Sequence, residues 1–143
     1  MKLLKLVLAI TLFAFADFSM AQEKVDTKGI TTKVKFEELV SGYLEDLNGK
    51  YKLRATEVTY GPGGYVGPHH HSGPGIRYVV SGQVTFVQAG KATIYKAGDF
   101  FYESGNVVHT GHNKTGAPIR MIFFEVLPAD WLGGSSFIPS KLR

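Results

Sequence analysis

Gly63-Gly64-Tyr65-Val66-Gly67-Pro68-His69-His70-His71-Ser72-Gly73-Pro74-Gly75 is the stretch that decides how this sequence is interpreted. It holds three of the five histidines of the chain in consecutive positions, between a glycine-rich turn and a strand-like run over residues 76–81. Successive side chains of a strand point to opposite faces, so His69 and His71 share one face while His70 points away. Two imidazoles on one face, with a third from elsewhere, make an ordinary transition-metal site. Taken alone, the cluster is equally compatible with a solvated loop tip that binds nothing.

A second segment supplies the third imidazole. From Gly63 the chain reads G-x5-H-x-H and continues to Gly82, and from Gly98 it reads G-x5-S-x-N-x2-H-x3-N, with His109 as the histidine. These segments resemble the two short motifs of the cupin superfamily, G-x5-H-x-H-x3,4-E-x6-G and G-x5-P-x-G-x2-H-x3-N. The matching positions are Gly63, His69, His71, Gly82, Gly98, His109 and Asn113.

The resemblance covers residues 55–126 and implies an all-β fold, the double-stranded β-helix or small jelly-roll barrel. Two departures stand out: Gly75 occupies the position of the first-motif glutamate, and Ser104 and Asn106 replace the Pro and Gly of the second motif. One of the four protein ligands of the family is therefore missing. Some cupin thiol and diketone dioxygenases, however, hold iron with three histidines alone.

The resemblance thus implies one divalent transition metal on His69, His71 and His109. Iron or manganese is the expected ion, with nickel or zinc as alternatives. Three neutral nitrogen ligands leave positions open for water, dioxygen or a chelating substrate.

The pattern of turns independently favours an all-β fold. The chain contains 17 glycines, and short β-rich runs are separated by turn signals such as Asn48-Gly49 and Ser81-Gly82-Gln83. Closely spaced short strands are typical of a sandwich or barrel. No convincing helix pattern follows residue 21, which argues against an α/β fold. The length of 143 residues suits one domain, which we place at residues 33–128.

Residues 1–21 read as a cleavable signal peptide. Lys2 and Lys5 precede an apolar run over residues 6–15, and Ser19-Met20-Ala21 provides small residues for cleavage after Ala21. A buried N-terminal helix is the alternative. The interpretation predicts a periplasmic or secreted protein without a stable membrane anchor, because the apolar run is short for a membrane span.

The two ends of the mature chain are expected to be irregular. Residues 22–32 are predicted to be a flexible leader or an edge arm, and residues 129–143 a mostly looped C-terminal tail. Apolar residues near both ends make a homodimer an expectation. With 16 basic and 12 acidic residues and no long run of either sign, a nucleic-acid partner is not expected.

Arg77 is a candidate for substrate binding. If Gly75 faces the pocket, strand alternation places Arg77 on the same face, where its planar guanidinium could pair with a substrate carboxylate. A bulge near Gly75 would instead place Arg77 at the surface.

Three further residues are candidates for a supporting role around the metal. Glu103 precedes the second-motif loop and could approach the ion, although Tyr102 has an equal claim to the inward face. His112 has the opposite strand parity to His109, which favours an outer or surface position. Asn113 is expected to fix its loop through side-chain hydrogen bonds.

The leading functional hypothesis is a metal-dependent enzyme with dioxygenase- or lyase-type chemistry on a small oxygen- or carboxylate-bearing molecule. The sequence does not assign a catalytic residue. A non-catalytic module that binds a small ligand is the first alternative, and the missing glutamate favours it. The second is a metal-free isomerase in which His69 or His109 acts as a general base.

Overall fold

The computed structural model describes residues 24–140, which form nine β-strands and no helix. The strands are β1 (Thr27–Leu39), β2 (Tyr51–His71), β3 (Gly75–Ser81), β4 (Gln83–Gln88), β5 (Lys91–Lys96), β6 (Phe100–Glu103), β7 (His109–His112), β8 (Ile119–Pro128) and β9 (Phe137–Pro139). Residues 24–140 accordingly offer no apolar helix of membrane-spanning length. The predicted signal peptide lies outside the described residues.

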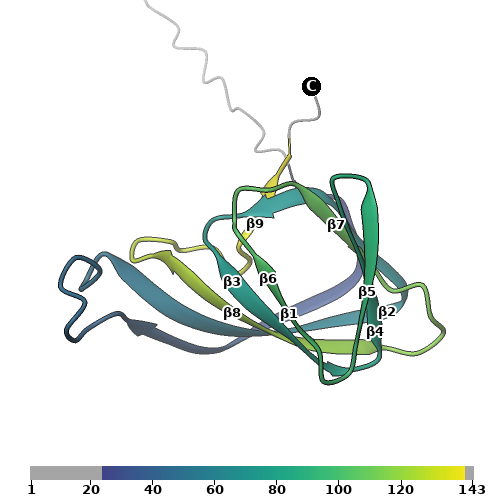
Figure 1. The fold of residues 1–143 in the computed structure, drawn as a ribbon, viewed down its shortest axis with the longest axis horizontal. Helices are drawn as coiled ribbons and strands as arrows, with labels where there is room; N and C mark the ends of the chain where they lie inside the picture. The colour runs from purple at the N-terminus through teal and green to yellow at the C-terminus, as the bar shows by residue number, and fades with distance from the viewer. Residues whose placement is uncertain (1–23, 141–143) are drawn as a thin grey trace, which may run out of the picture.

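The strands form a nearly closed antiparallel barrel, which confirms the predicted double-stranded β-helix (Figure 1). The order is β5-β4-β7-β2-β8-β3-β6, and β1 and β9 also pair with β2. The long strand β2 therefore contacts four others. It pairs with β8 along its first half, from Tyr51 opposite Pro128 to Tyr60 opposite Ile119, and with β7 beyond the glycines.

The glycine-rich segment bends β2 without ending it. The sequence predicts a break over residues 61–64, but the strand continues to His71. Gly63 takes a left-handed φ of 67°, which glycine adopts without strain. A Cβ on Gly64 would lie 2.8 Å from the carbonyl oxygen of Gly61, so the backbone packs too closely there for a side chain. The bend carries the histidines from the sheet to the barrel mouth.

The core fills the barrel below the histidines. Its buried apolar members are Val58, Tyr60, Val66, Val79, Val84, Phe86, Phe101, Ile119, Met121 and Phe123. Strand β8 shows why: its buried and exposed positions alternate, with Met121 and Phe123 facing inward. Glu125 occupies the next inward position, as a charged side chain on an otherwise apolar face.

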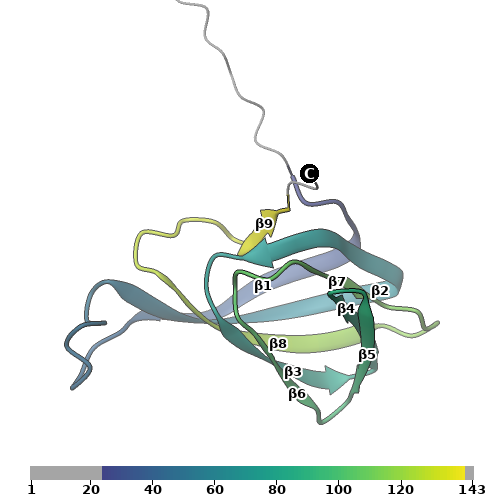
Figure 2. The same ribbon diagram turned by 45° about the horizontal axis from the view of Figure 1, so that its top comes forward.

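Both ends of the domain contribute a strand. Residues 27–32, expected as a flexible leader or edge arm, belong to strand β1, which pairs with β2 from Thr27 opposite Val66. In the predicted tail, β9 pairs with the last three residues of β2, at the barrel mouth (Figure 2). Backbone hydrogen bonds form these pairings, so they need no apolar alternation, which is the usual strand signal.

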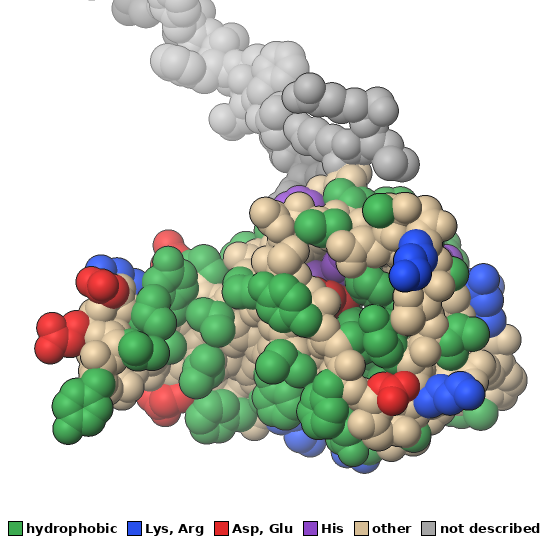
Figure 3. Space-filling view, in the orientation of Figure 1, with side chains coloured by type: hydrophobic (Ala, Val, Ile, Leu, Met, Phe, Trp, Pro, Cys, Tyr) green, Lys and Arg blue, Asp and Glu red, His purple; other side chains and the backbone are tan. Residues whose placement is uncertain are grey.

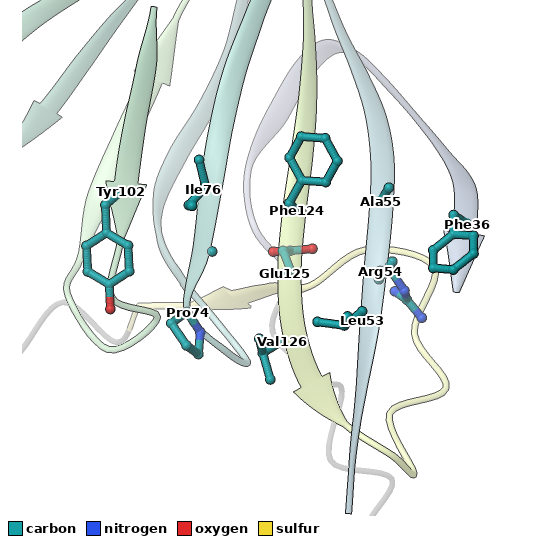
Figure 4. A pocket seen from close by; sticks show the side chains of 11 residues that line it. Phe36, Leu53, Arg54, Ala55, Pro74, Ile76, Tyr102, Phe124, Glu125 and Val126 are labelled. Atoms are coloured by element: carbon teal, nitrogen blue, oxygen red, sulfur yellow. The ribbon is translucent and has the colours of Figure 1, made fainter. Parts of the chain in front are cut away.

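The outer face of the sheet is apolar. Hydrophobic side chains gather on the face that carries β3, β6 and β8 (Figure 3). A hollow of about 700 Å³ lies there, and Figure 4 shows side chains from β1, β2, β3, β6 and β8 around it. Its apolar lining includes Phe36, Leu53, Ile76, Tyr102 and Phe124.

Candidate metal centre

The three predicted histidines converge inside the barrel mouth. Strand β2 supplies His69 and His71, and β7 supplies His109, which lies directly opposite His69 in the pairing of the two strands. All three are buried, and one ring nitrogen of each lies within 4.8 Å of those of the others. His70, on the opposite face of β2, is half-buried.

The other ring nitrogen of each histidine is already engaged. Nδ1 of His69 lies 2.8 Å from the carbonyl oxygen of Gly67, and Nδ1 of His109 lies 2.9 Å from that of Val107. A carbonyl oxygen only accepts hydrogen bonds, so in both rings Nδ1 carries the proton and Nε2 presents a lone pair. Such bonds fix the orientation and tautomer of metal-binding histidines.

His71 is held in the same sense by side chains. Its Nδ1 lies 2.8 Å from Oγ of Ser136 and 3.1 Å from Oε1 of Glu125. Nε2 atoms of His71 and His109 are buried and make no hydrogen bond. Buried polar atoms rarely lack a partner, so two such nitrogens facing one small space fit a metal ion. The donor set and its burial match what a divalent transition metal requires.

Burial controls the charge of two of these rings. Burial, together with the neighbouring His109 and His71, lowers the pKa of His69 to about 3. Burial also lowers the pKa of His109. Both rings are therefore neutral, as a metal ligand must be. At His71 burial again opposes protonation, but contacts with the carboxylates of Glu103 and Glu125 outweigh it and raise the pKa.

Arg77 faces inward and is fully buried, beside the histidines. Its Nε donates to Oε2 of Glu103 at 2.6 Å, and its Nη2 lies 2.5 Å from the same oxygen and 3.1 Å from Oε1 of Glu125. The guanidinium carbon lies 4.2 Å from the centre of the Phe123 ring. Its two ion-pair partners therefore come from the chain itself, and its predicted role toward a substrate carboxylate stays a prediction.

Glu103, and not Tyr102, takes the inward position on β6. Glu103 is 6% exposed, whereas Tyr102 is 64% exposed. Burial raises the pKa of the Glu103 carboxyl, but the guanidinium of Arg77 and the His71 ring more than offset this and hold it well below its ordinary value. Glu103 is therefore a buried anion at the edge of the histidine cluster.

The space enclosed by these groups is small. The histidines and Glu103 line a cavity of about 10 Å³, whose remaining walls are mostly apolar. This is room for about one water molecule or ion. A larger hollow of about 380 Å³ lies outside it, lined by residues 70–74 and 104–106 together with Ile138. His71 borders both spaces.

Strand β9 closes the mouth. The Phe137 ring lies 4.7 Å from the His69 ring and 5.3 Å from the His71 ring, centre to centre. Its neighbour Ser136 contacts both His71 and Glu125. The C-terminal segment thus covers two imidazoles and positions one of them.

The remaining predicted residues, His112 and Asn113, make their hydrogen bonds with groups other than the three imidazoles. His112 is half-buried, bonds to Thr110 and stacks on Tyr65. Asn113 is buried and donates to the carbonyl oxygens of Tyr60, Gly61 and Ala117, which fixes the loop before β8.

Two polar residues that touch the site were not among the predicted ones. Glu125 had a signal, since it is a charged residue at an inward position of the alternating strand β8. Ser136 had none, because nothing in a Gly- and Ser-rich tail indicates that it returns to the barrel mouth.

The comparisons with known proteins agree with this architecture. A family model described as a cupin domain matches residues 56–125. The polyketide cyclase RemF from Streptomyces resistomycificus is similar at 18% identity and a TM-score of 0.53, covering 77% of this chain and 81% of that one. A protein with a double-stranded β-helix domain from Klebsiella pneumoniae shows 19% identity and a TM-score of 0.53, covering 78% and 85%.

A cupin domain from Bordetella pertussis gives 16% identity and a TM-score of 0.51, covering 71% of this chain and 96% of that one. At these identities the likeness shows the fold alone. A search of the curated proteins finds no match to this chain.

Proposed function

The chain belongs to the cupin superfamily, and we propose that it is an enzyme with one divalent transition metal bound by His69, His71 and His109. The proposed chemistry is oxidation or lyase-type cleavage of a small molecule that carries oxygen or carboxylate groups. The observation that carries the proposal is the set of buried nitrogens. The Nε2 atoms of His71 and His109 have no hydrogen-bond partner, and the Nδ1 contacts point the rings the right way for a shared ion.

Iron or manganese is the proposed ion. Imidazole suits several transition metals, and a nearby carboxylate adds the oxygen ligand that iron and manganese accept readily. A bound ion of this kind supplies Lewis-acid or one-electron chemistry. The chain itself supplies three imidazoles, a buried anion and a mostly apolar wall that excludes bulk water.

The size of the cavity bears on the substrate. A space of about 10 Å³ has no room for an organic molecule. We place the substrate in the hollow of about 380 Å³ outside it, where Ser72, Ser104 and Asn106 offer polar groups and His71 forms the shared wall. A small polar molecule fits such a lining, whereas a large apolar one does not.

The first test is metal content by mass spectrometry on wild type, His71→Ala and His70→Ala. We expect near-stoichiometric iron or manganese in wild type, its loss in His71→Ala and its retention in His70→Ala. His70→Ala is a matched control, because it removes a histidine of the same triplet whose side chain lies on the other face of the strand. Retention would justify screening small carboxylates and diketones for turnover.

One outcome would remove the proposal. If all three proteins are empty after anaerobic loading with iron and with manganese, the metalloenzyme hypothesis is wrong. A binding module or a metal-free isomerase would then be the better interpretation.

A further inference from the structure

The position where the first cupin motif has its glutamate cannot hold a side chain in this fold. Gly75 lies opposite Glu103 on β6 and opposite Glu125 on β8. A Cβ on Gly75 would overlap Nη1 of Arg77 and the carbonyl oxygen of Phe124. The guanidinium of Arg77 occupies the space beside this glycine, so the chain has exchanged a carboxylate here for a cation.

A carboxylate nevertheless reaches the histidines from the neighbouring strand. Oε2 of Glu103 lies 3.0 Å from Nε2 of His71, and Oε1 lies 3.4 Å from Nε2 of His109. Neither nitrogen makes a hydrogen bond. Ligand atoms about 2.1 Å from one ion lie about 3.0 Å apart at right angles and about 3.4 Å apart at tetrahedral angles. Both separations are compatible with groups arranged around a shared ion, with Oε2 beside His71 and Oε1 beside His109.

Arg77 determines which oxygen of Glu103 is free. Both of its contacts with Glu103 go to Oε2, through Nε and Nη2. Oε1 is left facing His109. The guanidinium therefore holds Oε2, which also lies 3.0 Å from Nε2 of His71, and leaves Oε1 directed toward His109.

The balance of charge favours a cation at this point. The buried group formed by Glu103, Glu125 and Arg77 has two carboxylates and one guanidinium, hence one net negative charge. Burying an uncompensated charge is costly. When His71 is neutral, as a metal ligand must be, a divalent ion beside Glu103 would offset that charge.

We propose that Glu103 is the fourth protein ligand of the metal, taking from β6 the role that Gly75 cannot fill on β3, and that Arg77 positions it. This inference rests on the proposed function, since it needs a metal on the three histidines. Glu125, which pairs with the same arginine, contacts His71 on its Nδ1 side and is a positioning residue.

Cobalt(II) is the probe for the test, because its visible absorption reports the number and type of its ligands. The full chain would be titrated with cobalt in competition with a chelator, as wild type, Glu103→Gln, Glu125→Gln and Glu57→Gln. We expect Glu103→Gln to bind cobalt at least about tenfold more weakly and with a changed spectrum.

The two other variants separate a ligand from a neighbour. Glu125→Gln should weaken binding without changing the spectrum, because the ligands stay the same. Glu57→Gln changes a half-buried carboxylate that pairs with Arg120, and it should match wild type in both readouts. Equal affinity and an identical spectrum for wild type and Glu103→Gln would overturn the inference while leaving the proposed function intact.

Two further outcomes are covered. If wild type binds no cobalt, the proposed function fails and the inference falls with it. If circular dichroism shows that Glu103→Gln does not fold, Glu103→Asp is compared with wild type, because it keeps the charge beside Arg77 and withdraws the carboxylate by one methylene. The same tenfold loss and spectral change are then expected between these two, and their identity would refute the role of Glu103.

Discussion

Gly75 is constrained by its neighbours more than by its own backbone. Its φ lies outside the left-handed region, so another residue could adopt the conformation. The obstacle is space, since a methyl group would overlap the guanidinium of Arg77 and a carbonyl oxygen of β8. Because backbone yields little, the arginine would have to move and leave Glu103 and Glu125 without their partner.

We therefore expect Gly75→Ala to lower the free energy of unfolding by about 1–3 kcal/mol, as overpacked cores do. Urea unfolding followed by circular dichroism would measure it. Gly116→Ala is the control, because a Cβ there meets nothing within 4 Å, and its effect should stay within about 0.5 kcal/mol. Equal stability of the two variants would show that Arg77 moves aside at little cost.

At the scale of residues, the sequence predicted the face to which side chains point but not the residues that they contact. Strand parity placed His69 and His71 on one face, and placed Arg77 inward on the condition that Gly75 faces the pocket; the structure has all three buried. Parity could not say that Arg77 pairs with Glu103 and Glu125, because those contacts depend on the register between strands far apart in sequence. Parity alone also left Glu103 and Tyr102 undecided.

At the scale of elements, one carboxylate of β1 adds side-chain contacts to its backbone pairing with β2. Glu37 on β1 lies 3.0 Å from Nζ of Lys52 and 2.6 Å from Nε of Arg54, both on β2. The same two cations donate to the carbonyl oxygens of Trp131 and Gly133 in the C-terminal loop. Three segments therefore meet at two buried cations.

The pH dependence of this junction follows from Glu37. Its hydrogen bond with Lys52, helped by Arg54, lowers its pKa below the ordinary value of a glutamate. A carboxyl whose pKa is lowered by folding stabilises the fold at pH values above its ordinary pKa. This stabilisation is lost as the pH falls through the pKa of the folded state. We expect Glu37→Gln to be less stable than wild type by up to about 1 kcal/mol at neutral pH, since the side chain is partly exposed.

Urea unfolding of wild type and Glu37→Gln from about pH 7 to about pH 3 would check this. The difference between the two proteins should shrink as the pH falls below the ordinary pKa of the carboxyl. A difference that stays constant over this range would mean that the charge of Glu37 contributes nothing and that only its shape matters.

The prediction of elements succeeded where turns and apolar alternation were strong. The long run of β8 and the turn at Gly82 are in the structure as expected. The turn does not make a hairpin, because β3 pairs with β6 and β8 whereas β4 pairs with β5 and β7. Strands β1 and β9 were missed in part, because β1 begins in a polar segment and β9 has three residues. Their pairing depends on backbone groups of β2, which no side-chain pattern in their own sequence reveals.

At the scale of the whole molecule, the apolar outer face is the expected site of contact with another molecule. Ile76, Tyr102 and Phe124 are about half exposed or more around a hollow of about 700 Å³. Monomeric proteins seldom leave such side chains together in water. We expect a second copy of this chain to cover the face in a symmetric dimer, because identical apolar patches are self-complementary.

Analytical ultracentrifugation of wild type, Ile76→Lys and Tyr43→Lys would measure the assembly. Wild type should sediment as a dimer and Ile76→Lys as a monomer. Tyr43→Lys changes a fully exposed side chain in the loop after β1, away from the hollow, and should remain dimeric. A monomeric wild type at micromolar concentration would contradict the expectation.

The close packing of Arg77 against Gly75 affects how relatives of this chain can be recognised. A search that demands a glutamate at the fourth position after the second motif histidine rejects this chain. If the carboxylate has moved to the neighbouring strand, the informative motif is G-x5-H-x-H-x3-G-x-R, followed later by E-x5-H. In chains with that motif, the residues equivalent to Gly75, Arg77 and Glu103 should change together or not at all. A glutamate at position 75 would clash with the guanidinium of Arg77. A change from one motif to the other must therefore begin with the loss of the arginine.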